Sequence, residues 1–383
     1  MDKPTVQDIF HRFYPAYLDQ YSSSPVQAKV AHNIMNCKTG AYGANVCVCE
    51  DCGFVQIHYN SCRNRCCPMC QAVPKEMWMD ARREDVLDAP YFHLVFTVPN
   101  ILNPVIYSNQ RLLYDALYHA ASSTISELTA DPKHLGAKVG YICILHTWGS
   151  EMNFHPHIHT ILLGGGLASN NQWKDNGENF FLPIRVISKM FRGKYLEELK
   201  RLWEEDKLVF QGTAEKFRNH YTFKELLDSC YGMDWIPHCK KTFNGAQTVI
   251  KYLGKYTHRI AVSNHRIVRM DDDTVTFLVK DYRNEGQWKE LTISGVKFVR
   301  RFLMHVPPRR FVRIRHYGLL CSRTKSQKLT LCRNLLGCKK YLSKLRDMEM
   351  PEILEHLYGI KVCVCKACGG HLGKPQMKMP LRC

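Results

Sequence analysis

The chain has 383 residues, of which 45% are hydrophobic and 23% charged, values that exclude a disordered, collagen-like or purely coiled-coil protein. It carries 53 Lys and Arg against 35 Asp and Glu, and the resulting net charge of +18 favours a polyanionic partner, either nucleic acid or an acidic membrane surface. The N-terminus shows no signal-peptide pattern, and no apolar run approaches the ~18 residues that span a bilayer, so we expect a soluble, cytosolic protein. In a reducing compartment the 18 cysteines indicate thiolate metal ligands rather than disulfides.

A cysteine-rich segment, residues 37–70, predicts a small module held together by metal. Two CxxC pairs, Cys49/Cys52 and Cys67/Cys70, are separated by 14 residues, a spacing close to that of zinc ribbons. We expect these four thiolates to share one zinc, although Cys47 is a competing ligand. A second, cross-braced zinc would use the set His32, Cys37, Cys62 and Cys66; the alternative is that only one zinc binds. In the tail, Cys365 and Cys368 form either half of a broken zinc ribbon or free thiols.

The middle of the chain predicts an antiparallel sheet with helices. Residues 91–98 are apolar and β-branched and end at a proline, which is typical of a buried strand. Residues 111–128 have helical spacing, and residues 141–148 and 154–163 predict two strands of a hairpin. Residues 167–243 are more polar and include a helix near 189–208, so we interpret them as an insertion. We then expect a helix at 246–256, a hairpin at 259–270 and 274–280, a strand at 288–293 and a helix at 295–305.

Three histidines alternate along the second strand of the predicted hairpin, in the sequence His155-Pro-His157-Ile-His159. Side chains alternate between the two faces of a strand, so these histidines share one face. A lone histidine is usually structural, whereas three on one face more often indicate a metal site. Pro156 cannot donate a ladder hydrogen bond, which predicts a bulge just before His157 and leaves the direction of His155 open.

Two tyrosines, Tyr252 and Tyr256, lie four residues apart on the predicted helix and therefore share one of its faces. Such a pair more often packs on a core. Here it lies among Lys251, Lys255 and Arg259, a cationic setting in which a phenol could attack a phosphate. A phenol with a pKa near ~10 is a weak nucleophile, so that reaction requires a divalent metal and cations to bear the developing charge.

Residues 291–346 contain no Asp or Glu and 15 Lys and Arg, interleaved with aromatic residues. A charge run is often only a solvated surface, but an unmixed run of this length favours a polyphosphate, with aromatic side chains available to stack on single-stranded bases. The candidate DNA contacts in and near this run are Arg300, Arg301, Arg309, Arg310, Arg313 and Arg315, together with Lys251, Lys255 and Arg259.

HPHIH (residues 155–159) followed by YLGKYTHRIAVSN (252–264) resembles the HUH-type, two-tyrosine transposases of rolling-circle insertion sequences, the ninety-one family. The resemblance runs through nearly the whole chain. NSCRNRCCPMC (60–70) is similar to the zinc-binding domain of that family, except that Cys66 stands where the family usually has His. FHLVFTVP (92–99), LHTWGSEMNFHPHIHTILLGGGL (145–167) and VRIRHYGLL (312–320) resemble further family stretches.

The resemblance implies a mechanism. His157 and His159 would hold Mg²⁺ or Mn²⁺, with Gln247 as the first choice of third ligand and His155 as the second. Tyr252 or Tyr256 would attack single-stranded DNA at transposon ends, giving a 5′-phosphotyrosine and a free 3′-hydroxyl. Transesterification conserves the bond energy, which agrees with the lack of a phosphate-binding G-x-x-x-x-G-K-[ST] loop in the sequence.

We therefore expect an α+β protein with an antiparallel-sheet HUH endonuclease core and a tyrosine helix. The expected parts are a zinc module at 1–85, a nuclease domain at 86–310 with its insertion at 167–243, and a basic C-terminal extension at 311–383. The expected place of action is the bacterial cytoplasm, at the nucleoid. The alternatives are a rolling-circle replication initiator or relaxase, a non-catalytic zinc-finger DNA-binding regulator, and a zinc hydrolase that uses the three histidines.

Overall fold

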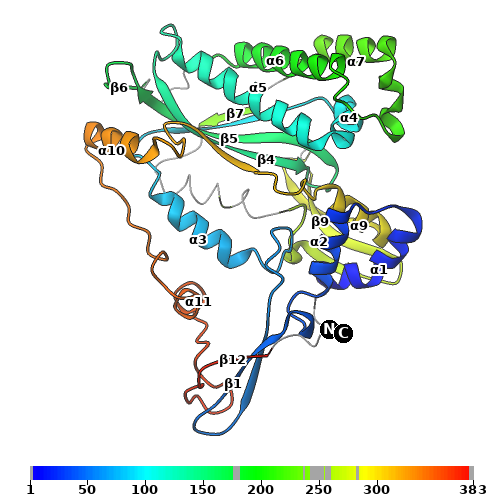
Figure 1. Cartoon of the computed structure of the whole chain (residues 1–383), viewed down its shortest axis with the longest axis vertical. Helices are drawn as coiled ribbons and strands as arrows, with labels where there is room; N and C mark the ends of the chain where they lie inside the picture. Colours follow the sequence, from blue (N-terminus) through cyan, green and yellow to red (C-terminus); the bar gives the residue numbers. More distant parts are fainter. Residues whose placement is uncertain are drawn as a thin grey trace.

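The computed structural model describes residues 3–175, 182–235, 238–241, 254, 260–281 and 284–378. Its centre is an antiparallel sheet of order β11-β4-β5-β3-β7, with β6 added beside β5 (Figure 1). The strands are β3 Tyr91–Thr97, β4 Lys138–Trp148, β5 Phe154–Leu167, β6 Trp173–Asp175, β7 His238–Lys241 and β11 Ile314–Gly318. The expected α+β class and antiparallel sheet are confirmed.

Helices cover both faces of this central sheet. On one face, Ile158 and Leu162 of β5 share a core with Leu117 and Phe191 of the helices above them. On the other face, Ile161 joins a core with residues of α3 and α10, because successive strand residues point to opposite sides. The upper helices are α4 Asn103–Ser108, α5 Gln110–Ala130, α6 Ile184–Glu204 and α7 His220–Gly232, and the lower ones are α3 Ala72–Arg83 and α10 Lys325–Leu336 (Figure 1).

A second core joins the N-terminal helices to a hairpin sheet from much later in the chain. Its elements are α1 Val6–Gln20, α2 Pro25–Met35, β8 Ile267–Met270, β9 Thr274–Asp281, β10 Gln287–Ser294 and α9 Gly295–Met304. Thr5 begins α1 with a capping box to Asp8, which satisfies free amides of the first turn. A Cβ on Gly295 would lie 2.2 Å from the Phe13 ring, so only glycine lets α9 approach α1 this closely.

A small third sheet of order β12-β1-β2 lies at the lower end of the molecule in Figure 1. Its strands are β1 Ala44–Val48, β2 Val55–Tyr59 and β12 Gln376–Lys378, and α11 Met350–Tyr358 precedes β12 along the tail. The C-terminal tail thus pairs with the N-terminal cysteine segment.

The strands and helices expected at 91–98, 111–128, 141–148, 154–163, 274–280, 288–293 and 295–305 are present. The strand expected from residue 259 starts only at Ile267, because Asn264–Arg266 form a 3-10 turn. The helix expected at 246–256 lies outside the described residues, apart from Gly254. Within the described ranges, no helix combines the length and apolar character needed to cross a membrane.

Core contacts cross the expected part boundaries, which stay a prediction. They cross residue 85, because α1 and α2 share their core with α9 and the hairpin sheet. Strand pairing crosses residue 310, because β11 pairs with β4 along its length. Two described elements of the expected insertion belong to the central fold, since α6 packs in the core above the sheet and β7 pairs with β3.

Candidate active site and metal centres

The hairpin of β4 and β5 carries the candidate active site, and its register is decided by a bulge. His146 pairs with His157, whereas Trp148 pairs with Phe154, so His155 and Pro156 together oppose a single residue of β4. This is the bulge expected from Pro156. It leaves His157 and His159 on one face and turns His155 aside, where its Nδ1 lies 3.3 Å from Oδ1 of Asn100.

Three imidazoles, those of His146, His157 and His159, converge on one point of the lower sheet face. One ring nitrogen of each lies within 4.8 Å of the others, and all three side chains are buried. The Nε2 atoms of His157 and His159 are 3.0 Å apart. Nδ1 of His157 lies 2.7 Å from the carbonyl oxygen of His155; donating its proton there leaves the Nε2 lone pair for a metal.

Burial keeps these rings in the neutral form that binds metals. It lowers the pKa of His157 to about 3, with the nearby imidazole of His155 acting in the same direction. Burial, then the neighbouring rings of His146 and His157, hold the pKa of His159 well below its ordinary value. A neutral, convergent imidazole set with no ring proton in the way is suited to a divalent metal ion.

His93 of β3 contacts His159 at the ring nitrogen that does not face His157. Its Nε2 is 2.9 Å from Nδ1 of His159, the two rings are nearly parallel, and His93 is buried. If Nδ1 of His159 donates to His93, Nε2 of His159 is left to face His157. His93 therefore has the position of a residue that orients a metal ligand. His93 was not among the expected site residues, since one histidine on a strand carries little signal.

His155, the second choice of third ligand, is not one of the three convergent imidazoles, although its ring centroid lies 5.1 Å from that of His157; its role as a ligand stays a prediction. Gln247 lies outside the described residues. His146 takes the third position, and the sequence did contain a signal for it: pairing the predicted strands across the turn at 149–153 brings His146 opposite His157.

The catalytic tyrosine candidates, Tyr252 and Tyr256, lie outside the described residues, as do Lys251, Lys255 and Arg259. Gly254, between the two tyrosines, is helical and buried. A Cβ on Gly254 would lie 2.0 Å from Sδ of Met79, so glycine permits the close contact with α3, below the same sheet face.

An aromatic and cationic border adjoins the imidazoles. The Trp148 ring stacks on His146 with centroids 4.5 Å apart. The Arg313 guanidinium lies 5.7 Å from the centroid of Trp148, and burial lowers its pKa. Arg313 is thus a cation held near the imidazole set.

The structure forms two cysteine tetrads, and both differ from the expected pairing. The first, which we call the inner tetrad, consists of Cys37, Cys62, Cys67 and Cys70. The second, the tail tetrad, consists of Cys49, Cys52, Cys365 and Cys368. Cys49 and Cys52 therefore do not join Cys67 and Cys70, because their knuckle lies beyond β1, where the C-terminal tail reaches them.

His32 and Cys66 are outside both tetrads. The His32 ring contacts Asn36 on its own helix, with Nδ1 3.3 Å from Nδ2 of that residue. Cys66 is buried, and desolvation raises the pKa of its thiol to about 11. In the inner tetrad the thiols are hydrogen-bonded to one another, which lowers the pKa of Cys70 and raises the pKa of Cys67.

Apart from Arg313, the described arginines of the expected DNA-binding set divide into two groups. Arg300, Arg309 and Arg310 are exposed. Arg315 is engaged internally: it pairs with Asp115 and stacks over Tyr118 at 4.0 Å. Arg301 donates to the carbonyl oxygen of Glu151. Only the exposed group has guanidinium ions available for a backbone phosphate.

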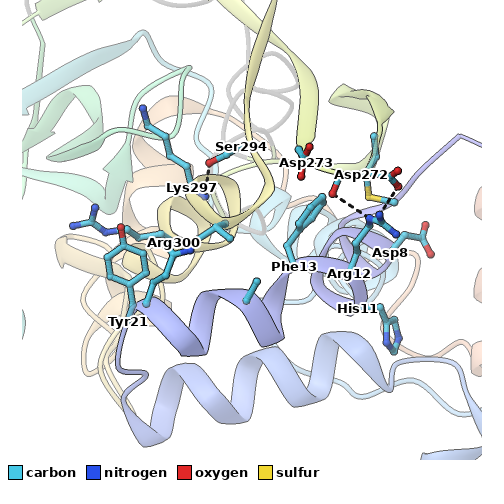
Figure 2. A pocket seen from close by; sticks show the side chains of 14 residues that line it. Asp8, His11, Arg12, Phe13, Tyr21, Asp272, Asp273, Ser294, Lys297 and Arg300 are labelled. Atoms are coloured by element: carbon cyan, nitrogen blue, oxygen red, sulfur yellow. Dashed lines mark hydrogen bonds and ion pairs between the residues drawn. The ribbon is translucent and has the colours of Figure 1, made fainter.

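A wide groove of about 1170 Å³ lies between α1 and α9, separate from the imidazole set (Figure 2). Asp272 and Arg12 form an ion pair across one end, and Arg300 stacks on Tyr21 at the other. Its lining mixes acidic and basic side chains, so it lacks the single sign of charge expected of a phosphate channel.

Comparison with known proteins identifies the family. A family model described as a putative transposase matches residues 140–328, which include β4 and β5, and one described as a transposase zinc-binding domain matches residues 9–98. A putative transposase of Sinorhizobium fredii is 40% identical over 95% of this chain and 93% of its own. The chain belongs to the insertion-sequence ninety-one family of transposases.

A more distant relative is the transposase for insertion sequence element IS801 of Pseudomonas savastanoi pv. phaseolicola. It is 28% identical over 82% of this transposase and 74% of its own length. Among solved structures, the metal-bound conjugative relaxase TrwC in complex with oriT DNA aligns at 12% identity, over 67% of this chain and 96% of that chain, with a TM-score of 0.26. The metal-free complex aligns over 43% and 71%, with a TM-score of 0.25. Similarity at this level supports no argument about mechanism.

Proposed function

We propose that this transposase nicks and rejoins single-stranded DNA at transposon ends through 5′-phosphotyrosine intermediates, in rolling-circle-type transposition. The observation that carries the proposal is the convergence of His146, His157 and His159 on one point of the sheet, in a chain of the transposase family. Tyr252 and Tyr256 are the proposed nucleophiles, which rests on their cationic setting in the sequence and on the family resemblance.

In the proposed reaction the phenol oxygen of one tyrosine attacks a DNA phosphorus. A new O–P bond forms, the bond to the 3′ oxygen breaks, and that oxygen leaves as a 3′-hydroxyl after taking up a proton. A free 3′-hydroxyl later attacks the phosphotyrosine and releases the phenol, so each step exchanges one phosphodiester for another. Two tyrosines allow one to cut the donor strand and the other the target.

Within this proposal His146, His157 and His159 hold Mg²⁺ or Mn²⁺. A bound ion polarises the attacked phosphate and stabilises its developing charge. The protein fixes the geometry: the β-bulge sets the register, the carbonyl oxygen of His155 orients His157, and His93 orients His159. Imidazole donors alone would also suit a transition metal, so Mg²⁺ and Mn²⁺ are proposed from the family resemblance.

For the N-terminal part, we propose that the inner tetrad binds one zinc ion. Its Sγ atoms are 3.4 Å apart for Cys37 and Cys70 and 3.6 Å for Cys62 and Cys70. Four thiolates at about 2.3 Å from one zinc lie about 3.8 Å from each other. Arg309 and Arg310 are the proposed phosphate contacts, because both side chains are exposed.

The test is an adduct assay. The full chain is incubated with Mg²⁺ or Mn²⁺ and with end-labelled single strands from the element's ends, and products are separated on denaturing SDS gels. A metal-dependent adduct that is lost in the Tyr252→Phe/Tyr256→Phe double variant supports the proposal. Cleavage without any adduct would indicate a histidine-metal hydrolase, and binding with neither product would indicate a DNA-binding regulator.

A further inference from the structure

The tail tetrad brings together the two ends of the chain. Cys49 and Cys52 follow β1, and Cys365 and Cys368 lie in the C-terminal tail. The Sγ atoms of Cys49 and Cys368 are 3.5 Å apart, and those of Cys52 and Cys365 are 3.8 Å apart. These separations are far longer than a disulfide bond and close to the about 3.8 Å between thiolates of a tetrahedral zinc site.

The backbone of the tail is shaped to present its two sulfur atoms. The amide of Ala367 donates to Sγ of Cys365, and the amide of Gly370 donates to Sγ of Cys368, each at 3.4 Å. The amide of Cys365 itself donates to the carbonyl oxygen of Gly370 at 2.8 Å, closing the turn. Amide donors around a sulfur stabilise the thiolate form, which is the form that binds metal.

Hydrogen bonds also fasten this turn to the first CxxC knuckle. The amide of Glu50 donates to the carbonyl oxygen of His371, and the amide of Gly373 donates to that of Val48. The carboxylate of Asp51 accepts from the amide of His371 at 3.1 Å. The two knuckles therefore face each other as parts of one site, although they come from opposite ends of the sequence.

The surroundings supply too little apolar burial to hold this arrangement alone. The buried cluster here consists of Cys47, Cys49, Cys365 and Leu372, so three of its four members are cysteines. The neighbouring Val55, Ile57 and Tyr59 of β2 are about half exposed. A unit with so small a core requires another source of stability, such as a structural metal.

We propose that Cys49, Cys52, Cys365 and Cys368 bind a second zinc ion, and that this zinc fastens the C-terminal tail to the N-terminal cysteine segment. The inner tetrad binds a different zinc, so the full chain holds two. Cys363 and Cys47 lie close by but outside the tetrad, and neither is a ligand.

The test is the zinc content of the full chain, purified under reducing conditions and measured by elemental analysis. We expect two zinc ions per chain in the parent and one in the Cys365→Ser/Cys368→Ser double variant. The matched control Cys363→Ser, which changes an exposed tail cysteine, should keep two. Two zinc ions in the double variant, or one in both parent and double variant, would overturn the proposal.

Limited proteolysis gives a second readout that needs neither DNA nor activity. Loss of the tail zinc should speed cleavage between the end of α11 and β12 by several fold, while fragments from the central sheet keep their parent rate. The Cys52→Ser variant should release the tail in the same way, although its substitution lies at the other end of the chain. An unchanged rate of tail cleavage in both variants would contradict the fastening role. If a variant is instead cleaved along its whole length, Cys49→Ser would replace it in the zinc measurement and in the proteolysis.

Discussion

Nε2 of His93 lies 2.9 Å from Nδ1 of His159, so a residue of the neighbouring strand β3 contacts one of the three convergent imidazoles. Partners of this kind orient metal ligands, and their loss typically weakens metal affinity about 10–100-fold. We expect that loss in His93→Leu, measured by Mn²⁺ titration of the full chain. His93→Gln, whose amide oxygen can still accept the proton of His159, should recover most of the affinity. Equal loss in both variants would mean that His93 only packs.

His146 and His155 should differ sharply when replaced. The ring of His146 belongs to the convergent set, whereas His155 points toward Asn100. A metal site contributes several kcal/mol of charge stabilisation, so His146→Ala and His157→Ala should each slow adduct formation at least about 100-fold. His155→Ala keeps the carbonyl that orients His157 and should stay within about threefold of the parent rate. A comparable collapse in His155→Ala would restore it as a ligand candidate.

Cys67 and Cys66 are neighbours with opposite expected roles. Cys67 belongs to the inner tetrad, and Cys66 is buried outside it. Elemental analysis should therefore find one zinc fewer in Cys67→Ser than in the parent and no change in Cys66→Ser. Zinc loss in both Cys66→Ser and Cys67→Ser would instead agree with the expectation from the sequence, in which the two cysteines belong to different zinc sites.

Asp80 of α3 fixes the segment that follows α10. Its carboxylate accepts hydrogen bonds from the Tyr341 hydroxyl at 2.7 Å and from the amide of Leu345 at 2.9 Å, and it also accepts one from Ser343. Asp80→Ala leaves these donors without their acceptor and should lower the free energy of unfolding by about 2–4 kcal/mol, measured by urea denaturation. Asp347→Ala removes an exposed carboxylate of the same segment and should change it by less than about 0.5 kcal/mol.

The same carboxylate gives a pH signature. Burial acts to raise the pKa of Asp80, but the hydrogen bonds from Ser343, Leu345 and Tyr341 outweigh it and hold the pKa below its ordinary value. Its stabilisation is therefore complete above about pH 4 and disappears as the pH falls further. The stability difference between Asp80→Ala and the parent should shrink on acidification below that value, and a constant difference would contradict this account.

His316 of β11 should make the fold sensitive to milder acid. Burial lowers its pKa to about 4, and the nearby cations Arg82 and Lys325 act in the same direction, against Asp85. Between about pH 6.5 and 4 the unfolded chain binds a proton at this site that the folded chain does not. The free energy of unfolding therefore decreases as the pH is lowered, by up to about 1.4 kcal/mol per pH unit. His316→Gln should reduce that slope in urea titrations at pH 7, 6 and 5, whereas His119→Gln, an exposed control, should not.

The central hairpin could be predicted because its information is local. The local sequence of residues 141–148 and 154–163 predicted both strands, and Pro156 predicted the bulge. The face shared by His157 and His159 followed from the strand period of two. His146 was also within reach, since it needed only the pairing register. His93 was not, because its contact with His159 depends on which strand lies on the other side of β5.

The zinc pairing could not be read from the sequence, since CxxC spacing identifies knuckles but not their partners. Cys49 and Cys52 lie nearest in sequence to Cys67 and Cys70, yet the fold places the tail beside them through the pairing of β1 with β12. The packing across the expected part boundaries could not be read for a similar reason. The core shared by α1, α9 and the hairpin sheet is a long-range contact that no composition change marks.

The two sets of proposed metal ligands differ greatly in sequence separation, and this bears on the order in which the chain matures. The imidazole set belongs to one hairpin, and hairpins form within about 1–10 μs once their residues are available. Cys49 and Cys368 are 319 residues apart. At translation rates of roughly 5–20 residues per second, the first knuckle waits about 15–60 s for its partner. The tail zinc would therefore be captured only as synthesis finishes, and a chain broken off early would carry its histidines but never a closed tail tetrad.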